Sequence, residues 1–141
     1  MGGVLAIETG ARNSSVVAVI DDSGFDTLPD VIGFKFSQIT RLPSWLDMGM
    51  MTVQSLDLNF NASEVRPLDD ASKLHKPLLV IIGAKDQLVP PIEGNNIYNA
   101  ASNPKELMVV LKAGHVDSYS VDTKRYRNCS DTPKASSYVT I

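Results

Sequence analysis

Three short apolar runs constrain the fold of this chain more than any other feature of its sequence. They span 16–20 (VVAVI), 78–82 (LLVII) and 107–111 (LMVVL), and small or polar residues stop each of them. None of the runs alternates strictly between apolar and polar residues. Each is therefore expected to be a strand covered on both faces, which is typical of a parallel sheet. The sequence predicts an α/β fold built on three parallel strands.

Helices are expected to flank these strands. A short helix over 3–12 (GVLAIETGAR) precedes the first run, although Gly10 weakens it by roughly 1 kcal/mol relative to alanine. Pro90 and Pro91 open a second helix near 92–102, because proline is tolerated in a first turn. Strand, helix and strand across 78–111 then form one βαβ unit, which is expected to be right-handed.

The segment between the first two strands is longer than one crossover helix requires. Prolines interrupt its small apolar clusters, so the sequence predicts a lobe or cap-like insertion at 25–65 within a single domain spanning 1–141. Side chains in this segment could line a substrate pocket or simply pack the lobe. Both readings stay open for Trp45, Met48, Met50 and Met51.

The end of the chain has an unusual composition. Asp122 and Thr123 are suitable N-cap residues for a helix that follows them. Beyond that start, the segment NCSDTPKASSYVTI offers a proline and several hydroxyl residues but no apolar stripe. The tail at 128–141 is therefore expected to be disordered or aberrant rather than folded onto the core.

Charge and composition exclude several classes of function. The formal net charge is -3 and the basic residues are scattered, which argues against a nucleic-acid partner. No apolar run approaches the roughly 20 residues that span a membrane, and the first residues do not form a secretory signal. Cys129 is the only cysteine and there are two histidines, so we expect no metal centre and no cofactor. The default expectation is a cytoplasmic location.

An acid and a histidine follow two consecutive predicted strands. Asp86 comes shortly after the second run, and His115 comes shortly after the third. In open parallel sheets, ligands bind outside the carboxyl ends of the strands. Taken alone, Asp86 could be an ordinary turn residue and His115 a partly exposed ring. Their joint placement favours an acid–base pair, whereas His75, next to Lys76, is expected to lie on the surface.

Several segments resemble the α/β-hydrolase superfamily. The stretch KPLLVIIGAKDQLVPP is similar to its strand and acid turn, written PxLxxxGxxDxxVP. The stretch NPKELMVVLKAGHVDSY is similar to its last strand and histidine loop, and VVAVIDDSGFDTL to the segment after the nucleophile helix. The resemblance covers about 1–24 and 64–126. It implies the carboxyl-terminal half of a serine hydrolase of the esterase or peptidase type, containing the last three strands of that fold.

The resemblance also implies roles for individual residues. In a Ser–Asp–His triad, serine attacks a carbonyl, histidine takes its proton, and the acid orients the imidazole. Asp86 would be the acid and His115 the base. The nucleophile of this superfamily stands in G-x-S-x-G. Because the chain begins Met1-Gly2-Gly3, Met1 would occupy the oxyanion-hole position directly after the serine, and we expect a fragment that lacks its nucleophile.

Other polar residues near the predicted sheet receive plainer interpretations. Asp21 and Asp22 are adjacent on a strand and point to opposite faces, so a solvated strand end is expected rather than a metal site. None of the nearby serines stands in G-x-S-x-G, which argues against a substitute nucleophile. These serines are Ser14, Ser15 and Ser23.

Two functions remain possible from the sequence. The first is part of a hydrolase for small-molecule esters or amides, inactive alone because the nucleophile is missing. The second is a non-catalytic α/β binding or interaction module that pairs with another chain. Three parallel strands without neighbours would leave an exposed sheet edge, so self-association through that edge is possible.

Overall fold

A computed structural model describes residues 2–40 and 64–130 of the chain. The chain divides into two compact units, which are treated separately below. One unit comprises Met1–Asp26 and Pro67–Ile141, and the other comprises Thr27–Arg66. The larger unit contains the sheet and every described residue of the candidate site.

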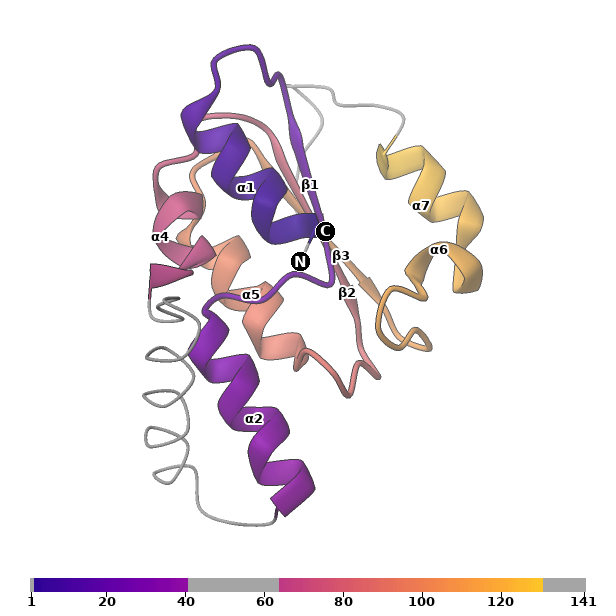
Figure 1. The fold of residues 1–141 in the computed structure, drawn as a ribbon. Coiled ribbons are helices and arrows are strands. Elements are labelled where there is room, and N and C mark those ends of the chain that lie inside the picture. The colour runs from indigo at the N-terminus through magenta and orange to yellow at the C-terminus, as the bar shows by residue number, and fades with distance from the viewer. Residues whose placement is uncertain (1, 41–63, 131–141) are drawn as a thin grey trace. The chain divides into compact units, whose positions relative to one another are not determined.

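The larger unit is built on a three-stranded parallel sheet with the order β1-β2-β3 (Figure 1). Strand β1 spans Val19–Asp22, β2 spans Leu78–Gly83 and β3 spans Lys105–Val110. The central strand β2 pairs in parallel with both neighbours. These findings confirm the predicted α/β class and the three parallel strands.

The first strand begins later than the sequence predicted. A strand was expected at 16–20, but β1 starts at Val19, and the side chain of Val17 is 79% exposed. Pairing explains the shift, because β1 has β2 as its described neighbour and Val19 is in register with Leu78, the first residue of β2. Upstream of that residue, β2 offers no strand partner. The apolar composition of 16–18 therefore does not make it part of the sheet.

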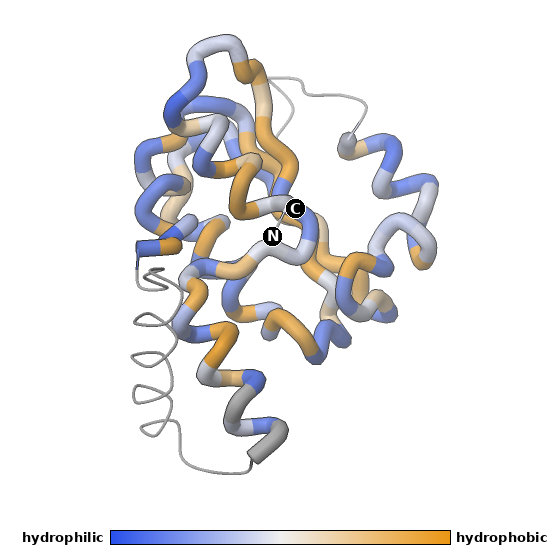
Figure 2. The backbone as a smooth tube through the Cα atoms, viewed as in Figure 1, coloured by the Kyte–Doolittle hydropathy of each residue, from blue (hydrophilic) through white to orange (hydrophobic). Residues whose placement is uncertain are grey.

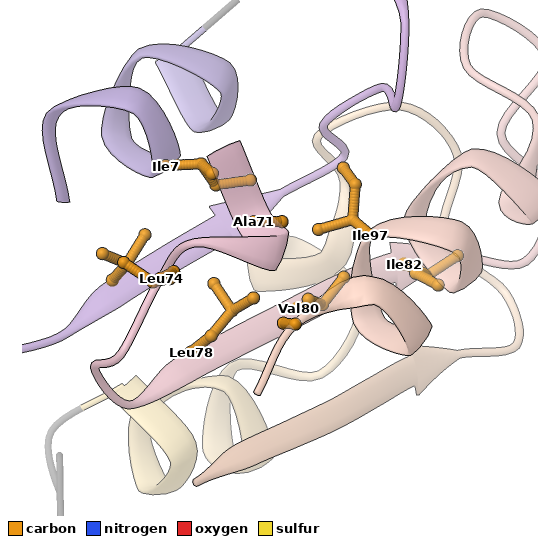
Figure 3. Packing of buried hydrophobic residues seen from close by; sticks show 9 residues of the cluster. Ile7, Ala71, Leu74, Leu78, Val80, Ile82 and Ile97 are labelled. Carbon is orange, nitrogen blue, oxygen red and sulfur yellow. The ribbon is translucent and has the colours of Figure 1, made fainter. Parts of the chain in front are cut away.

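One face of the sheet is covered by three helices (Figures 1 and 3). These are α1 (Gly2–Arg12), α4 (Pro67–Ser72) and α5 (Pro91–Ala100). Alternate residues of a strand point to the same face, and Leu78, Val80 and Ile82 of β2 accordingly belong to this cluster. Ile7 and Ile97 pack against them and are fully buried. The predicted helices at 3–12 and 92–102 are thus present with small shifts of their ends.

The opposite face carries a second apolar cluster. Leu79 and Ile81 of β2 join Met108 and Val110 of β3 there. Helices α6 (Ser118–Val121) and α7 (Thr123–Ser130) lie on this side of the sheet (Figure 1). Both faces of β2 are consequently buried, which explains its continuous apolar sequence, visible along the strands in Figure 2.

Helix α7 packs against the sheet, although its sequence has no apolar stripe. Tyr126 and Cys129 contact the second apolar cluster, so this helix has a packing face of two residues. Its amino terminus is capped as expected, because Asp122 Oδ1 accepts a hydrogen bond of 3.2 Å from the Arg125 amide. The predicted tail at 128–141 begins inside this helix, and its remainder, 131–141, lies outside the described residues.

The smaller unit contains helix α2, which spans Leu28–Thr40. The Thr27 hydroxyl accepts a hydrogen bond of 3.3 Å from the Asp30 amide and so caps this helix. Residues 41–63 lie outside the described part of the chain, so the predicted lobe at 25–65 stays a prediction. The same holds for the possible pocket residues Trp45, Met48, Met50 and Met51.

Candidate active site

Asp86 is held rigidly in the turn that follows β2. Its backbone amide donates to the Gly83 carbonyl at 3.1 Å. Its Oδ1 atom accepts hydrogen bonds from the Leu88 and Val89 amides at 2.8 and 2.9 Å. The side chain is 2% exposed. A carboxylate that accepts two backbone amides is fixed in orientation, so its second oxygen points in one defined direction.

The loop that carries His115 is attached to the acid turn through backbone contacts. The Ala84 amide donates to the Val110 carbonyl at 3.0 Å, and the Lys85 amide donates to the Ala113 carbonyl at 2.9 Å. Gly83 permits this approach, because a Cβ atom there would lie 2.3 Å from the carbonyl oxygen of Gly114. The acid turn and the His115 loop are therefore held side by side at the carboxyl end of the sheet.

These two loops bring Asp86 and His115 into direct contact. His115 Nδ1 lies 2.8 Å from Asp86 Oδ2. The Asp86 carboxylate is an acceptor, so it favours the tautomer in which Nδ1 carries the proton and Nε2 is left to take one. The imidazole is 31% exposed, whereas the acid is buried. An oriented, partly exposed imidazole backed by a buried acid is suited to general acid–base chemistry.

A second buried acid lies at the end of β1, where the sequence predicted a solvated strand end. That prediction was wrong for Asp21, which is 0% exposed. Neither of its carboxylate oxygens has a hydrogen-bond partner among the described residues. Burial, followed by the nearby charge of Asp22, raises the pKa of Asp21 to about 7. The Gly24 amide offsets part of this rise without reaching hydrogen-bond geometry.

The remaining predicted residues are placed as follows. His75, Ser14 and Ser15 are exposed, in agreement with their plain interpretations. Ser23 is buried, and its hydroxyl donates to Asp22 Oδ1 at 3.2 Å. Met1, the expected oxyanion-hole residue, lies outside the described residues. Asp86 and His115 are in direct contact, and their catalytic roles stay predictions.

Two residues beside the site have a backbone conformation that the sequence reasoning did not foresee: Val116 was not considered, and Ser23 was weighed only as a nucleophile. Ser23 and Val116 both adopt the left-handed backbone conformation, with φ of 56° and 59°. A valine in this conformation is unusual, and its position directly after His115 places it at the site. No composition or spacing signal marks such a residue, because the strain is imposed by tertiary contacts.

Residues 2–40 and 64–130 contain no group of three or more potential metal-ligating side chains (His, Cys, Asp or Glu). Within the same residues, no helix has the length and apolar character needed to cross a membrane.

Sequence comparison finds relatives of unassigned function. No protein-family model matches the chain. It is 27% identical over 133 residues to the protein YqkD of Bacillus subtilis (strain 168), which covers 90% of this chain and 43% of YqkD. A 31.7 kDa protein of the traX-finO intergenic region of Escherichia coli is 37% identical over 57 residues, or 40% of this chain and 20% of that protein. The chain thus spans less than half of these relatives.

Structural comparison identifies the fold. The Pyrococcus furiosus esterase matches with a TM-score of 0.65 at 23% identity, over 91% of this chain and 47% of the esterase. The acylaminoacyl peptidase of Pyrococcus horikoshii matches with a TM-score of 0.64 at 20% identity, over 92% of this chain and 22% of the peptidase. Both are α/β-hydrolases. The chain therefore has a partial α/β-hydrolase fold, as the sequence resemblance implied.

Proposed function

We propose that this chain supplies the acid and the base of a Ser–Asp–His triad that hydrolyses ester or amide bonds. The contact of 2.8 Å between His115 Nδ1 and Asp86 Oδ2 carries this proposal. In such a triad the acid orients the imidazole and stabilises its charged form, while Nε2 takes the proton of the nucleophile. The buried, doubly hydrogen-bonded Asp86 and the partly exposed His115 fit these two roles.

The nucleophile in this proposal is a serine outside the 141 residues. Ser14 and Ser15 lie in the turn before the amino end of β1, whereas Asp86 and His115 follow the carboxyl ends of β2 and β3. The Ser23 hydroxyl is engaged with Asp22 rather than with an imidazole. The resemblance also implies that the backbone nitrogen of Met1 would contribute to the oxyanion hole of the whole enzyme, because Met1 directly precedes Gly2 and Gly3. The small-molecule ester or amide substrate belongs to the whole enzyme, and the chain alone is expected to have negligible turnover.

A fluorophosphonate probe tests the absence of a nucleophile. We expect no stoichiometric labelling of the purified chain and no turnover of p-nitrophenyl acetate above the level of a His115→Gln variant. A serine hydrolase labelled in the same reaction shows that the probe is active. Labelling of any one serine at a ratio near one would refute this part of the proposal and identify the nucleophile by mass spectrometry.

A second candidate is an interaction module that self-associates through the free edge of β1. Within the described residues, β1 pairs on one side only, with β2. The apolar side chain of Ile20 in this strand is 38% exposed, and Val17, which precedes the strand, is 79% exposed. An unpaired strand with apolar side chains is a template for pairing with another chain.

Light scattering after size exclusion distinguishes a monomer from a dimer of this kind. The proposal of self-association predicts a concentration-dependent mass that falls to the monomer value in Ile20→Lys, because an edge lysine opposes strand pairing. Ile92→Lys is the matched control, since Ile92 is also exposed but belongs to α5. A chain that is monomeric at every concentration would contradict the second candidate.

A further inference from the structure

Two strained backbone positions meet beside His115. Ser23 follows β1, and Val116 follows His115, yet both have positive φ angles. Such conformations persist where the surrounding contacts over-determine them, and they concentrate at functional sites. For Val116 the conformation is especially unfavourable because its side chain is β-branched. A specific contact must therefore hold the backbone directly after the imidazole.

That contact is a hydrogen bond between the two strained residues. The Val116 amide donates to Ser23 Oγ at 3.2 Å. The backbone of Ser23 is fixed in turn, because its amide donates to the Ile81 carbonyl of β2 at 3.0 Å. Ser23 thus links the end of the central strand to the residue after His115, over a sequence separation of 93 residues.

The orientation of the Ser23 hydroxyl is set by a second interaction. Its proton is donated to Asp22 Oδ1 at 3.2 Å, so a lone pair of Oγ faces the Val116 amide. The other oxygen, Asp22 Oδ2, accepts a hydrogen bond of 3.0 Å from the Tyr126 hydroxyl. Burial, followed by the charge of Asp22, raises the pKa of Tyr126 to about 12, which keeps this donor protonated. The chain of bonds ends in the apolar cluster that Tyr126 contacts.

We propose that Ser23 is a positioning residue that holds the His115 loop against the acid turn through its hydrogen bond to the Val116 amide. This inference rests on the proposed function, since it assigns Ser23 a part in presenting the proposed base. Without the Ser23 hydroxyl, the Val116 amide loses its hydrogen-bond acceptor. The backbone of Val116 can then move away from its strained positive φ. The imidazole, one residue away, then leaves Asp86 for part of the time.

The Nδ1–H proton of His115 provides a direct readout in the full chain. In proton NMR, its hydrogen bond to Asp86 separates this proton from other imidazole signals and slows its exchange with water. We expect Ser23→Ala and Ser23→Gly each to reduce protection from exchange by roughly tenfold, the factor expected for one net hydrogen bond. Glycine adopts the φ of Ser23 without steric cost, so Ser23→Gly tests the hydroxyl in a relaxed backbone.

The controls separate this inference from the proposed function. Ser118→Ala removes another buried hydroxyl, one without a hydrogen-bond partner among the described residues, and should leave the His115 signal unchanged. Asp86→Asn should abolish the protected signal; if it does not, the proposed acid–base pair itself fails. If Asp86→Asn removes the signal but either Ser23 variant retains full protection, the positioning role of Ser23 is wrong. Loss of protection in both Ser23 variants, with Ser118→Ala unchanged, supports it.

Discussion

The substitution Asp21→Asn should stabilise the chain above neutral pH. The Asp21 carboxylate is buried in close contact with Gly3 and Gly24. A Cβ atom on Gly3 or Gly24 would lie 1.8 or 1.9 Å from its Oδ1. Its carboxylate has no hydrogen-bond partner among the described residues, so the ionised form is poorly solvated. Asparagine has nearly the same shape and carries no charge at any pH.

The magnitude follows from the shift of the pKa. The pKa of Asp21 rises from 3.8 to about 7 in the folded chain. Each unit corresponds to about 1.4 kcal/mol, so ionised Asp21 costs up to about 4 kcal/mol. Below about pH 3 the Asp21 side chain is protonated in both the folded and the unfolded chain, so its burial costs no stability there. Between pH 4 and 7 the unfolded chain ionises while the folded chain keeps the proton, so stability falls with rising pH; above pH 7 the loss is constant.

Urea unfolding followed by circular dichroism between pH 4.5 and 8.5 measures this loss. The difference in unfolding free energy between Asp21→Asn and the parent chain should grow from about 1 kcal/mol at pH 4.5 to a plateau of about 4 kcal/mol near pH 8. Asp117→Asn is the control, because it removes the same charge from an exposed aspartate. A difference that does not change with pH, or a less stable Asp21→Asn at pH 8, would refute the reasoning.

Three further predictions concern packing and the single thiol. Gly83→Ala should destabilise the chain by about 1–3 kcal/mol in thermal unfolding, because its Cβ would meet the Gly114 carbonyl oxygen at 2.3 Å; an unchanged melting temperature would contradict this close approach. Leu79→Ala in the second cluster should cost about 2–5 kcal/mol in urea unfolding, whereas Leu5→Ala at an exposed site should cost less than about 0.5 kcal/mol. Burial and then the Glu106 carboxylate raise the pKa of Cys129. The rate of its alkylation by iodoacetamide should therefore rise at a higher pH in the folded chain than in the urea-unfolded chain. Identical pH profiles of alkylation in the folded and unfolded chain would contradict the raised pKa.

The sequence predicted the sheet because the central strand is buried on both faces. Leu78–Gly83 has a uniform apolar pattern, and its two faces are filled by separate clusters. The start of β1 was misplaced because apolar composition does not show where the partner strand begins. Val17 is apolar but exposed, whereas Val19 is paired with Leu78. Composition alone cannot separate these two valines.

The site was predictable only as far as topology fixes it. Asp86 and His115 follow neighbouring parallel strands, so their loops meet at one end of the sheet. The burial of Asp21 was not predictable, because it depends on how closely two glycines approach the carboxylate. The bond between Ser23 and Val116 joins distant residues through backbone geometry, which no local pattern encodes.

The central claim is that Asp86 orients His115 as a base, and the tautomer of His115 tests it most directly. Nitrogen-15 NMR of the imidazole rings resolves the two histidines, and the exposed His75 serves as an internal reference. The account predicts that neutral His115 carries its proton on Nδ1 and that Asp86→Asn shifts this preference while His75 is unchanged. An identical tautomer mixture in both histidines, unaffected by Asp86→Asn, would contradict it.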